Sequence, residues 1–130
     1  MKKKGLLPQK LLTELELEIM SRVWAHYPCT VREVQTALKA EKELAYTSIA
    51  TIMKILEEKG FLTSQKNEKT HLFSPCVSKE SYESKALKHV AEKLFNGSPG
   101  SMVARLLDEA ELSPEDIKKI RMILKERDKT

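Results

Sequence analysis

The stretch from Tyr46 to Gly60 most narrows what this chain can fold into, because it has the pattern of a helix with one buried and one polar face. Its apolar residues recur at helical spacing: Ile49, Ile52, Met53 and Leu56. Short hydroxyls and one lysine occupy another face: Thr47, Ser48, Thr51 and Lys54. Such side chains can bond to DNA bases and phosphates. We therefore expect a helix from about Ala45 to Lys59 that lies in a DNA groove.

Two helices are predicted before this stretch, and each begins with a capping box, in which Ser or Thr is followed three residues later by Glu. Thr13 and Glu16 open the first helix, and Thr30 and Glu33 open the second. Their apolar stripes predict the buried faces: Leu15, Ile19, Met20, Val23 and Trp24 in the first, and Val31, Val34 and Leu38 in the second. Three such helices in so short a segment predict a helix-turn-helix domain.

The pattern changes after Gly60, which as a C′ glycine ends the third helix. Residues 61–66 and 70–74 are rich in strand formers, and Asn67, Glu68 and Lys69 form a polar turn between them. We expect a hairpin with a three-residue loop, the wing of a winged helix, whose tip carries Lys66 and Lys69.

The rest of the chain predicts helices only. Ser78 caps a helix to about Asn96, a short helix follows Gly100, and Ser113 with Pro114 opens the last. The fold class is therefore mainly α with a small β-hairpin. Its predicted parts are a flexible basic arm (1–11, with Lys2, Lys3 and Lys4), a winged-helix DNA-binding domain (12–77) and a three-helix dimerisation domain (78–130).

Each C-terminal helix has an apolar stripe that needs a partner, because so small a unit buries little surface alone. The stripes either fold back on the winged helix or pack against a second chain. The second arrangement suits a DNA-binding protein, because a two-fold dimer matches a palindromic site. The predicted dimerisation residues are Leu87, Val90, Leu94, Met102, Val103, Leu106, Leu107, Ile117, Ile120, Ile123 and Leu124.

Composition and motifs argue against several other functions. The net charge is +4, which is compatible with nucleic acid. No apolar run is long enough to span a membrane and no signal peptide is present, so we expect a soluble cytoplasmic protein. Cys29 and Cys76 lie far apart, outside zinc-site spacings. The histidines form no ligand motif, and catalytic motifs are missing. We expect no enzyme activity, cofactor or metal.

A protein-binding winged helix without sequence-specific DNA binding is the alternative function. A protein-binding face would carry large apolar or aromatic anchors. The third helix instead presents Thr47, Ser48 and Thr51. Threonine is a poor helix former, so its use on an exposed helix face favours DNA contact over simple solvent exposure.

Several sequence blocks resemble the penicillinase repressor (BlaI/MecI) family of bacterial transcriptional repressors, over about Leu11 to Glu126. The blocks that carry the resemblance are Leu12-Thr13-x-Leu15-Glu16-x-Glu18-Ile19-Met20, Val23-Trp24, Thr30-Val31-Arg32-Glu33-Val34, Ala45-Tyr46-Thr47-Ser48-Ile49-x-Thr51, Lys59-Gly60-Phe61-Leu62, Phe73-Ser74-Pro75-x-Val77-Ser78 and the helix from Ser113 to Leu124. The resemblance implies a homodimeric repressor whose third helix enters the major groove of a palindromic operator.

On this chain, the resemblance implies groove contacts for Thr47, Ser48 and Thr51, with Lys54 as their neighbour. It also adds two residues that the pattern alone marks as cap and surface: Thr30 and Arg32 would meet phosphate. The hairpin tip would contact the DNA backbone.

The chain departs from the family pattern at three places. Ile55 stands where family members often carry a basic residue. The cysteine-rich metal motif of the copper-responsive branch is missing. The position that matches the Asn-Phe bond cleaved in antibiotic-responsive members is Arg105-Leu106. This argues against induction by that cleavage, although a sensor-linked protease of other specificity stays open as a partner.

Overall fold

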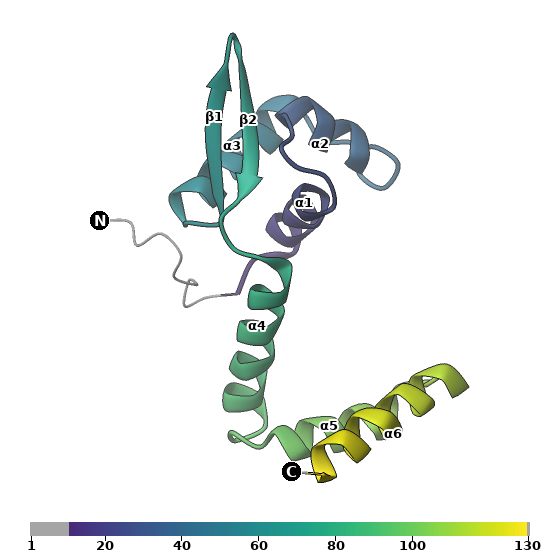
Figure 1. The fold of residues 1–130 in the computed structure, drawn as a ribbon. Coiled ribbons are helices and arrows are strands. Elements are labelled where there is room, and N and C mark those ends of the chain that lie inside the picture. Colours follow the sequence, from purple (N-terminus) through teal and green to yellow (C-terminus); the bar gives the residue numbers. More distant parts are fainter. Residues whose placement is uncertain (1–10, 130) are drawn as a thin grey trace. The chain divides into compact units, whose positions relative to one another are not determined.

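The computed structural model describes residues 11–129, so the predicted basic arm, apart from Leu11, lies outside the described residues. The elements follow the predicted order (Figure 1). They are α1 (Glu14–Ala25), α2 (Val31–Leu38), α3 (Tyr46–Glu58), β1 (Leu62–Asn67), β2 (Thr70–Pro75), α4 (Lys79–Leu94), α5 (Pro99–Glu109) and α6 (Pro114–Asp128). None of the helices in this part of the chain is long and apolar enough to cross a membrane.

The ends of the first three helices confirm the local signals in the sequence. Thr13 and Thr30 are the N-caps of α1 and α2, and both capping boxes form. Helix α3 ends in a Schellman motif, in which the Phe61 N–H bonds to the Leu56 carbonyl and the Gly60 N–H to the Glu57 carbonyl. Gly60 has a φ of +91°, a conformation that glycine adopts without steric cost.

The hairpin forms as predicted, but its loop is shorter than predicted. Asn67 pairs with Thr70, so only Glu68 and Lys69 form the loop, and Glu68 has a φ of +60°. A third extended segment, around Cys29, was not predicted from the sequence. Cys29 exchanges two backbone hydrogen bonds with Phe73, which attaches the α1–α2 connection to β2. The wing is therefore anchored at its base to the helical part.

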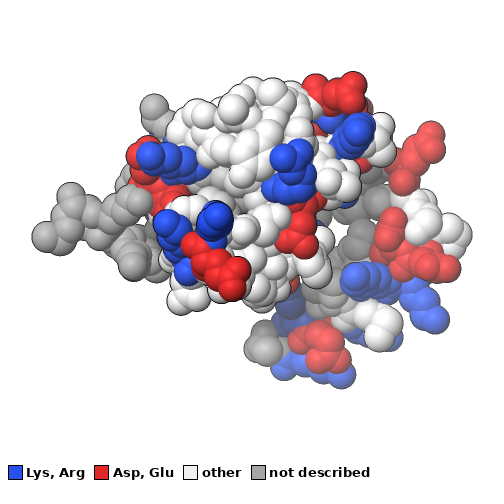
Figure 2. Space-filling view, turned by 90° about the horizontal axis from the view of Figure 1, so that it is seen from above, with Lys and Arg blue, Asp and Glu red and all other residues white. Residues whose placement is uncertain are grey.

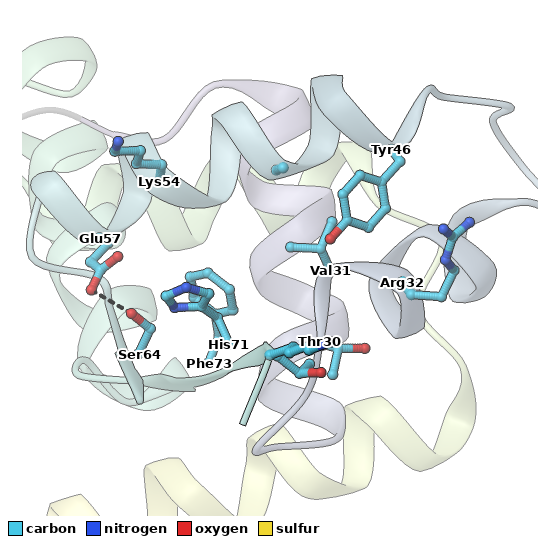
Figure 3. Close-up of a pocket in the computed structure, with 12 residues that line it drawn as sticks. Thr30, Val31, Arg32, Tyr46, Lys54, Glu57, Ser64, His71 and Phe73 are labelled. Atoms are coloured by element: carbon cyan, nitrogen blue, oxygen red, sulfur yellow. Dashed lines mark hydrogen bonds between the residues drawn. The ribbon is translucent and has the colours of Figure 1, made fainter. Parts of the chain in front are cut away.

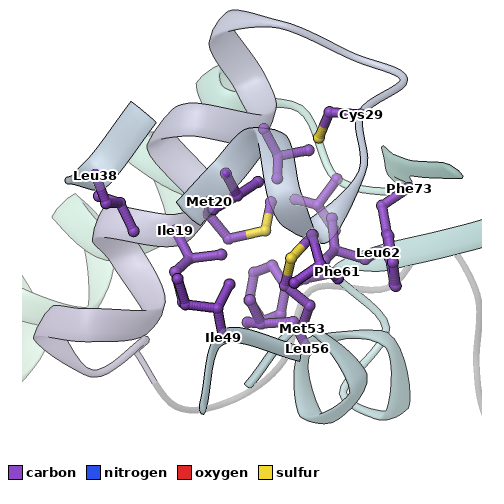
Figure 4. Packing of buried hydrophobic residues seen from close by; sticks show 14 of the residues in the cluster. Ile19, Met20, Cys29, Leu38, Ile49, Met53, Leu56, Phe61, Leu62 and Phe73 are labelled. Carbon is purple, nitrogen blue, oxygen red and sulfur yellow. The ribbon is translucent and has the colours of Figure 1, made fainter. Parts of the chain in front are cut away.

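The core lies where α1, α2 and α3 meet the base of the hairpin (Figure 4). Each of these three helices contributes the apolar stripe predicted for it, although Leu15, Trp24 and Ile52 are only partly buried. The fully enclosed large side chains are Phe61, Ile19, Met20, Leu38, Ile49, Met53, Leu56, Leu62, Val23 and Val34. Burying each such side chain contributes about 1.5–3 kcal/mol relative to leaving it in water.

Helix α4 belongs in part to this first compact unit, which ends between Ala86 and Leu87. The reason is Tyr82, which is buried with its ring 5.8 Å from that of Trp24 and 5.9 Å from that of Phe61. Its hydroxyl also accepts a hydrogen bond from the Leu12 N–H at 3.0 Å. Residues 79–86 thus complete the first core. The predicted domain boundary before Ser78 stays a prediction.

The second unit begins at Leu87 and contains the rest of α4 with α5 and α6. Ser98 and Ser113 cap the last two helices, each followed by Pro at the first helical position. No residue of α5 or α6 is buried. Large apolar side chains are exposed along all three helices, with Leu94 reaching 72%. The bond between Arg105 and Leu106, the proposed counterpart of the family's cleavage position, lies inside α5.

Both cysteines are free thiols in this structure. Cys29 is buried, and burial, with a smaller effect of Glu33, raises its pKa to about 11. Cys29 therefore stays protonated at neutral pH, as expected of a small core residue.

One ion pair joins α1 to the end of α3. Among residues 11–129, Glu16 is the only charged residue that is buried, and its Oε2 accepts a hydrogen bond from Lys59 Nζ at 2.7 Å. Burial raises the pKa of Glu16, but the hydrogen bonds from Lys59 and Thr13 outweigh it and leave the pKa below its ordinary value. The ionised form of Glu16 is therefore favoured by folding.

We predict that Glu16→Gln lowers the free energy of unfolding by about 1–2 kcal/mol at neutral pH, because Lys59 loses its charged partner. The predicted loss is smaller than the roughly 3–5 kcal/mol for breaking a fully buried pair, because Lys59 is 44% exposed. Urea unfolding would measure it. The difference from the wild type should be full above about pH 4.5 and should shrink as the pH falls through the lowered pKa of folded Glu16.

Glu18→Gln is the matched control, because Glu18 lies on the same helix and also pairs with a lysine, Lys42, but its side chain is 25% exposed whereas that of Glu16 is 8% exposed. This change should have much less effect. A stability difference for Glu16→Gln that stays constant down to low pH would contradict the assigned role of the ion pair.

Candidate nucleic-acid interface

The exposed face of α3 carries the hydroxyls that the sequence singled out. Ile49, Met53 and Leu56 are buried, and helical geometry then directs Thr47 and Thr51 away from the core. Both threonines are exposed. The Thr51 hydroxyl donates to the Thr47 carbonyl at 2.8 Å, so its proton is already used within the helix. Its oxygen lone pairs and its methyl group remain available to a ligand.

A groove of about 650 Å³ lies between α3, the start of α2 and the hairpin (Figure 3). Residues of all three elements line it: Thr30, Val31, Arg32, Tyr46, Ala50, Lys54, Glu57, Ser64, Lys69, Thr70, His71 and Phe73. The α3 residues among them recur every three or four positions, so one side of α3 forms a wall of the groove. Four predicted DNA-binding residues thus come together here, namely Thr30, Arg32, Lys54 and Lys69.

The start of α2 places a polar group and a cation at one end of the groove. Thr30 Oγ1 accepts from the Glu33 N–H at 3.1 Å, which leaves the hydroxyl proton of Thr30 able to donate. The guanidinium of Arg32 lies over the Tyr46 ring, with Cζ 4.9 Å from the ring centroid. A helix N-terminus with a cation beside it favours an anion such as phosphate.

The wing is joined to α3 by a hydrogen bond across the groove. Ser64 Oγ on β1 donates to Glu57 Oε2 on α3 at 2.8 Å (Figure 3). This contact holds the strands at a fixed place beside the helix. It also puts a carboxylate in the groove, which would repel a phosphate that came close.

The hairpin tip presents two lysines. Lys66 pairs with His71 in the ladder, Lys69 lies in the loop, and all three side chains are exposed. Figure 2 views the first unit from the side of the hairpin tip and shows much uncharged surface, with Lys and Arg side chains interspersed with acidic ones. No continuous basic patch covers this face.

The loop between α2 and α3 is attached to α1 by two ion pairs. Arg22 Nη2 lies 2.9 Å from Glu41 Oε1, and Lys42 Nζ lies 2.9 Å from Glu18 Oε1. The hydrogen bond to Glu18 raises the pKa of Lys42. In addition, Gln35 Nε2 donates to the Leu44 carbonyl at 3.0 Å. These contacts fix the approach of the chain to the start of α3.

The remaining predicted residues lie outside the groove. Ser48 is exposed on α3, and Lys66 projects from β1 near the tip. Ile55 is exposed as well, at the place where relatives often carry a basic residue. Sequence reasoning did not select Tyr46, Glu57, Ser64 or His71 as site residues. Only the spacing of Tyr46, Ala50 and Lys54 at every fourth position could have pointed to the groove wall.

Comparisons with known proteins identify relatives that match most of the chain. The sequence profile described as "Penicillinase repressor" matches residues 12–126. The penicillinase repressor of Bacillus licheniformis is 29% identical over 115 residues, which cover 88% of this chain and 90% of that protein. The methicillin resistance regulatory protein MecI of Staphylococcus aureus strain N315 is 22% identical over 116 residues, 89% of this chain and 94% of its own.

Solved structures match about three fifths of the chain. The DNA-binding domain of the repressor BlaI is 28% identical, covers 63% of this chain and 94% of its own, and has a TM-score of 0.52. A monomeric form of Bacillus licheniformis BlaI, in complex with the blaP half-operator, has a TM-score of 0.50 at 23% identity and covers 59% of this chain and 94% of its own. These matches establish the winged-helix fold.

Proposed function

The chain belongs to the penicillinase repressor family, a family of transcriptional repressors and not of enzymes, and from this we propose that it represses transcription as a homodimer on a palindromic operator. In this proposal α3 enters the major groove of the operator. The wing and the start of α2 contact the DNA backbone on either side of it.

The observation that carries the proposal is the exposure of hydroxyls and a lysine on the one face of α3 that the core leaves free. Thr47, Thr51 and Lys54 lie on this face. The groove beside it collects the cations of α2 and the wing. BlaI, with the same winged-helix fold, was solved in complex with the blaP half-operator. This arrangement suits a duplex whose bases face α3 and whose phosphates meet the neighbouring elements.

The proposed interface makes two kinds of contact, one that contributes mainly affinity and one that contributes mainly sequence discrimination. Thr30, Arg32, Lys66 and Lys69 would meet phosphates, which supplies most of the affinity and makes it sensitive to salt. Thr47, Ser48 and Thr51 would meet base edges, which supplies discrimination between sequences. Because the Thr51 proton is used within α3, Thr51 would accept a hydrogen bond or contact a thymine methyl.

Dimerisation would occur through the second unit. Its helices expose long apolar stripes, and α5 and α6 bury no residue within the single chain. A second copy would cover these stripes and present a second α3, which matches the two-fold symmetry of a palindromic site. The eleven residues predicted for the interface, from Leu87 to Leu124, all belong to this unit.

We predict that Thr51→Ala costs about 1–3 kcal/mol of binding at one operator base pair and relaxes the preference there, because a base contact is lost. Titrations against duplexes from the region upstream of the protein's own gene, each with one base pair changed, would measure this. Thr51→Val is the control that keeps a methyl group and loses the oxygen. Equal losses on operator and random DNA would contradict base reading by Thr51.

Lys66→Ala should weaken binding to every duplex and reduce the salt slope of log K by about one unit, because one phosphate contact is lost. Glu68→Asn is the control at the same tip: it removes a negative charge at a position with positive φ that Asn tolerates, so binding should stay equal or become tighter. Binding constants across a salt series give both values. A Lys66→Ala effect limited to one sequence would be inconsistent with a backbone contact.

Ile120→Asp should convert the dimer to a monomer, because it places an unpaired charge in the proposed interface. Sedimentation of the full chain would show the change. Lys119→Asp is the control, since Lys119 neighbours Ile120 on α6 but has a charged, exposed side chain. An unchanged dimer in Ile120→Asp would show that this stripe does not form the interface.

A further inference from the structure

We propose that Tyr46 is a positioning residue that holds the guanidinium of Arg32 ready for a DNA phosphate at the start of α2. This inference rests on the proposed function and adds to it a residue that acts through another one. The sequence pattern assigned Tyr46 no role in the site. Its ring lines the groove between α2 and α3 (Figure 3).

Three segments of the chain fix the position of Arg32. Its Cζ lies 4.9 Å from the centroid of the Tyr46 ring on α3, within the range of a cation–π interaction. Its Nη1 donates to Gln35 Oε1, one turn along α2, at 3.2 Å. Gln35 in turn donates to the Leu44 carbonyl in the α2–α3 connection at 3.0 Å. Arg32 is thus located by an aromatic face and by an amide that is itself fixed.

The charge of Arg32 is not used by the protein itself. Among residues 11–129, every ion pair of the structure joins other residues, and no carboxylate pairs with Arg32. A guanidinium has five N–H donors, and among residues 11–129 a single side-chain hydrogen bond, to Gln35, occupies one of them. Contact with an aromatic ring uses the face of a guanidinium and leaves donors at its edge, which match two oxygens of a phosphate.

The groups around Arg32 indicate which ligand its guanidinium would bind. Thr30, with a hydroxyl proton able to donate, and the N-terminus of α2 lie at the same end of the groove. Phosphate contacts made there would be independent of sequence, because they do not involve base edges. A long exposed arginine loses rotamer freedom when it binds, and prior placement by Tyr46 reduces that loss.

The test measures binding of the full chain across a salt series, with a random-sequence duplex and a duplex from the region upstream of its own gene. Tyr46→Phe keeps the ring and should bind as the wild type does. Tyr46→Leu and Tyr46→Ala lose the ring and should bind about two- to fivefold more weakly on both duplexes. Arg32→Ala should reduce the salt slope by about one unit.

The double variant Arg32→Ala/Tyr46→Ala decides whether Tyr46 contacts DNA directly or acts through Arg32. In an Arg32→Ala background, Tyr46→Ala should cost nothing further, because there is no guanidinium left to position. Thermal unfolding checks that the single variants are folded, which is expected because Tyr46 is 43% exposed.

Four results would overturn the inference while leaving the proposed function intact. Full binding by Tyr46→Ala would show that nothing is positioned, and full binding by Tyr46→Leu would show that bulk suffices without the ring. Equal weakness of Tyr46→Phe and Tyr46→Ala would assign the effect to the hydroxyl. An undiminished loss in the Arg32→Ala background would show that Tyr46 contacts DNA itself. If the wild type shows no salt-sensitive binding to either duplex, the proposed function fails as well.

Discussion

The buried face of α3 is the constraint on which the rest of the first unit depends. Ile49, Met53 and Leu56 are fully enclosed by α1, α2 and the base of the hairpin. Exposing even one of them by rotating the helix would cost about 1.5–3 kcal/mol. Because the helix cannot rotate, the same geometry holds Thr47 and Thr51 outward. Core packing alone therefore sets the direction in which the candidate DNA-contacting residues of α3 point.

The sequence predicted the features that depend on neighbouring residues, and missed those that depend on distant ones. A capping box joins residues three apart, and Gly60 acts through its own φ, so both could be read from the chain. The Cys29–Phe73 bridge and the Glu16–Lys59 pair join segments that meet only after packing. The hairpin loop was predicted one residue too long because Asn67 has turn composition, whereas strand register places it opposite Thr70.

The same distinction applies to the candidate site. The hydroxyl face of α3 was predictable because helical period alone separates it from the core. The groove was not, since it requires the start of α2 and the wing to come beside α3. Tyr46 shares the four-residue spacing of Ala50 and Lys54, but this spacing does not indicate which side chain of another helix Tyr46 contacts. Its relation to Arg32 becomes visible only when the two helices are placed together.

Charge placement matters more for this protein than total charge. The net charge is only +4, and carboxylates lie among the cations, with Glu57 in the groove and Glu68 at the hairpin tip. Long-range attraction to DNA is correspondingly weak, because opposite charges within a Debye length of about 8–10 Å largely cancel at a distance. At contact distance opposite charges no longer cancel in this way, because each phosphate of bound DNA would interact mainly with the nearest side chain. In the proposed interface, affinity would be highest in the register that brings phosphates to cations and not to carboxylates.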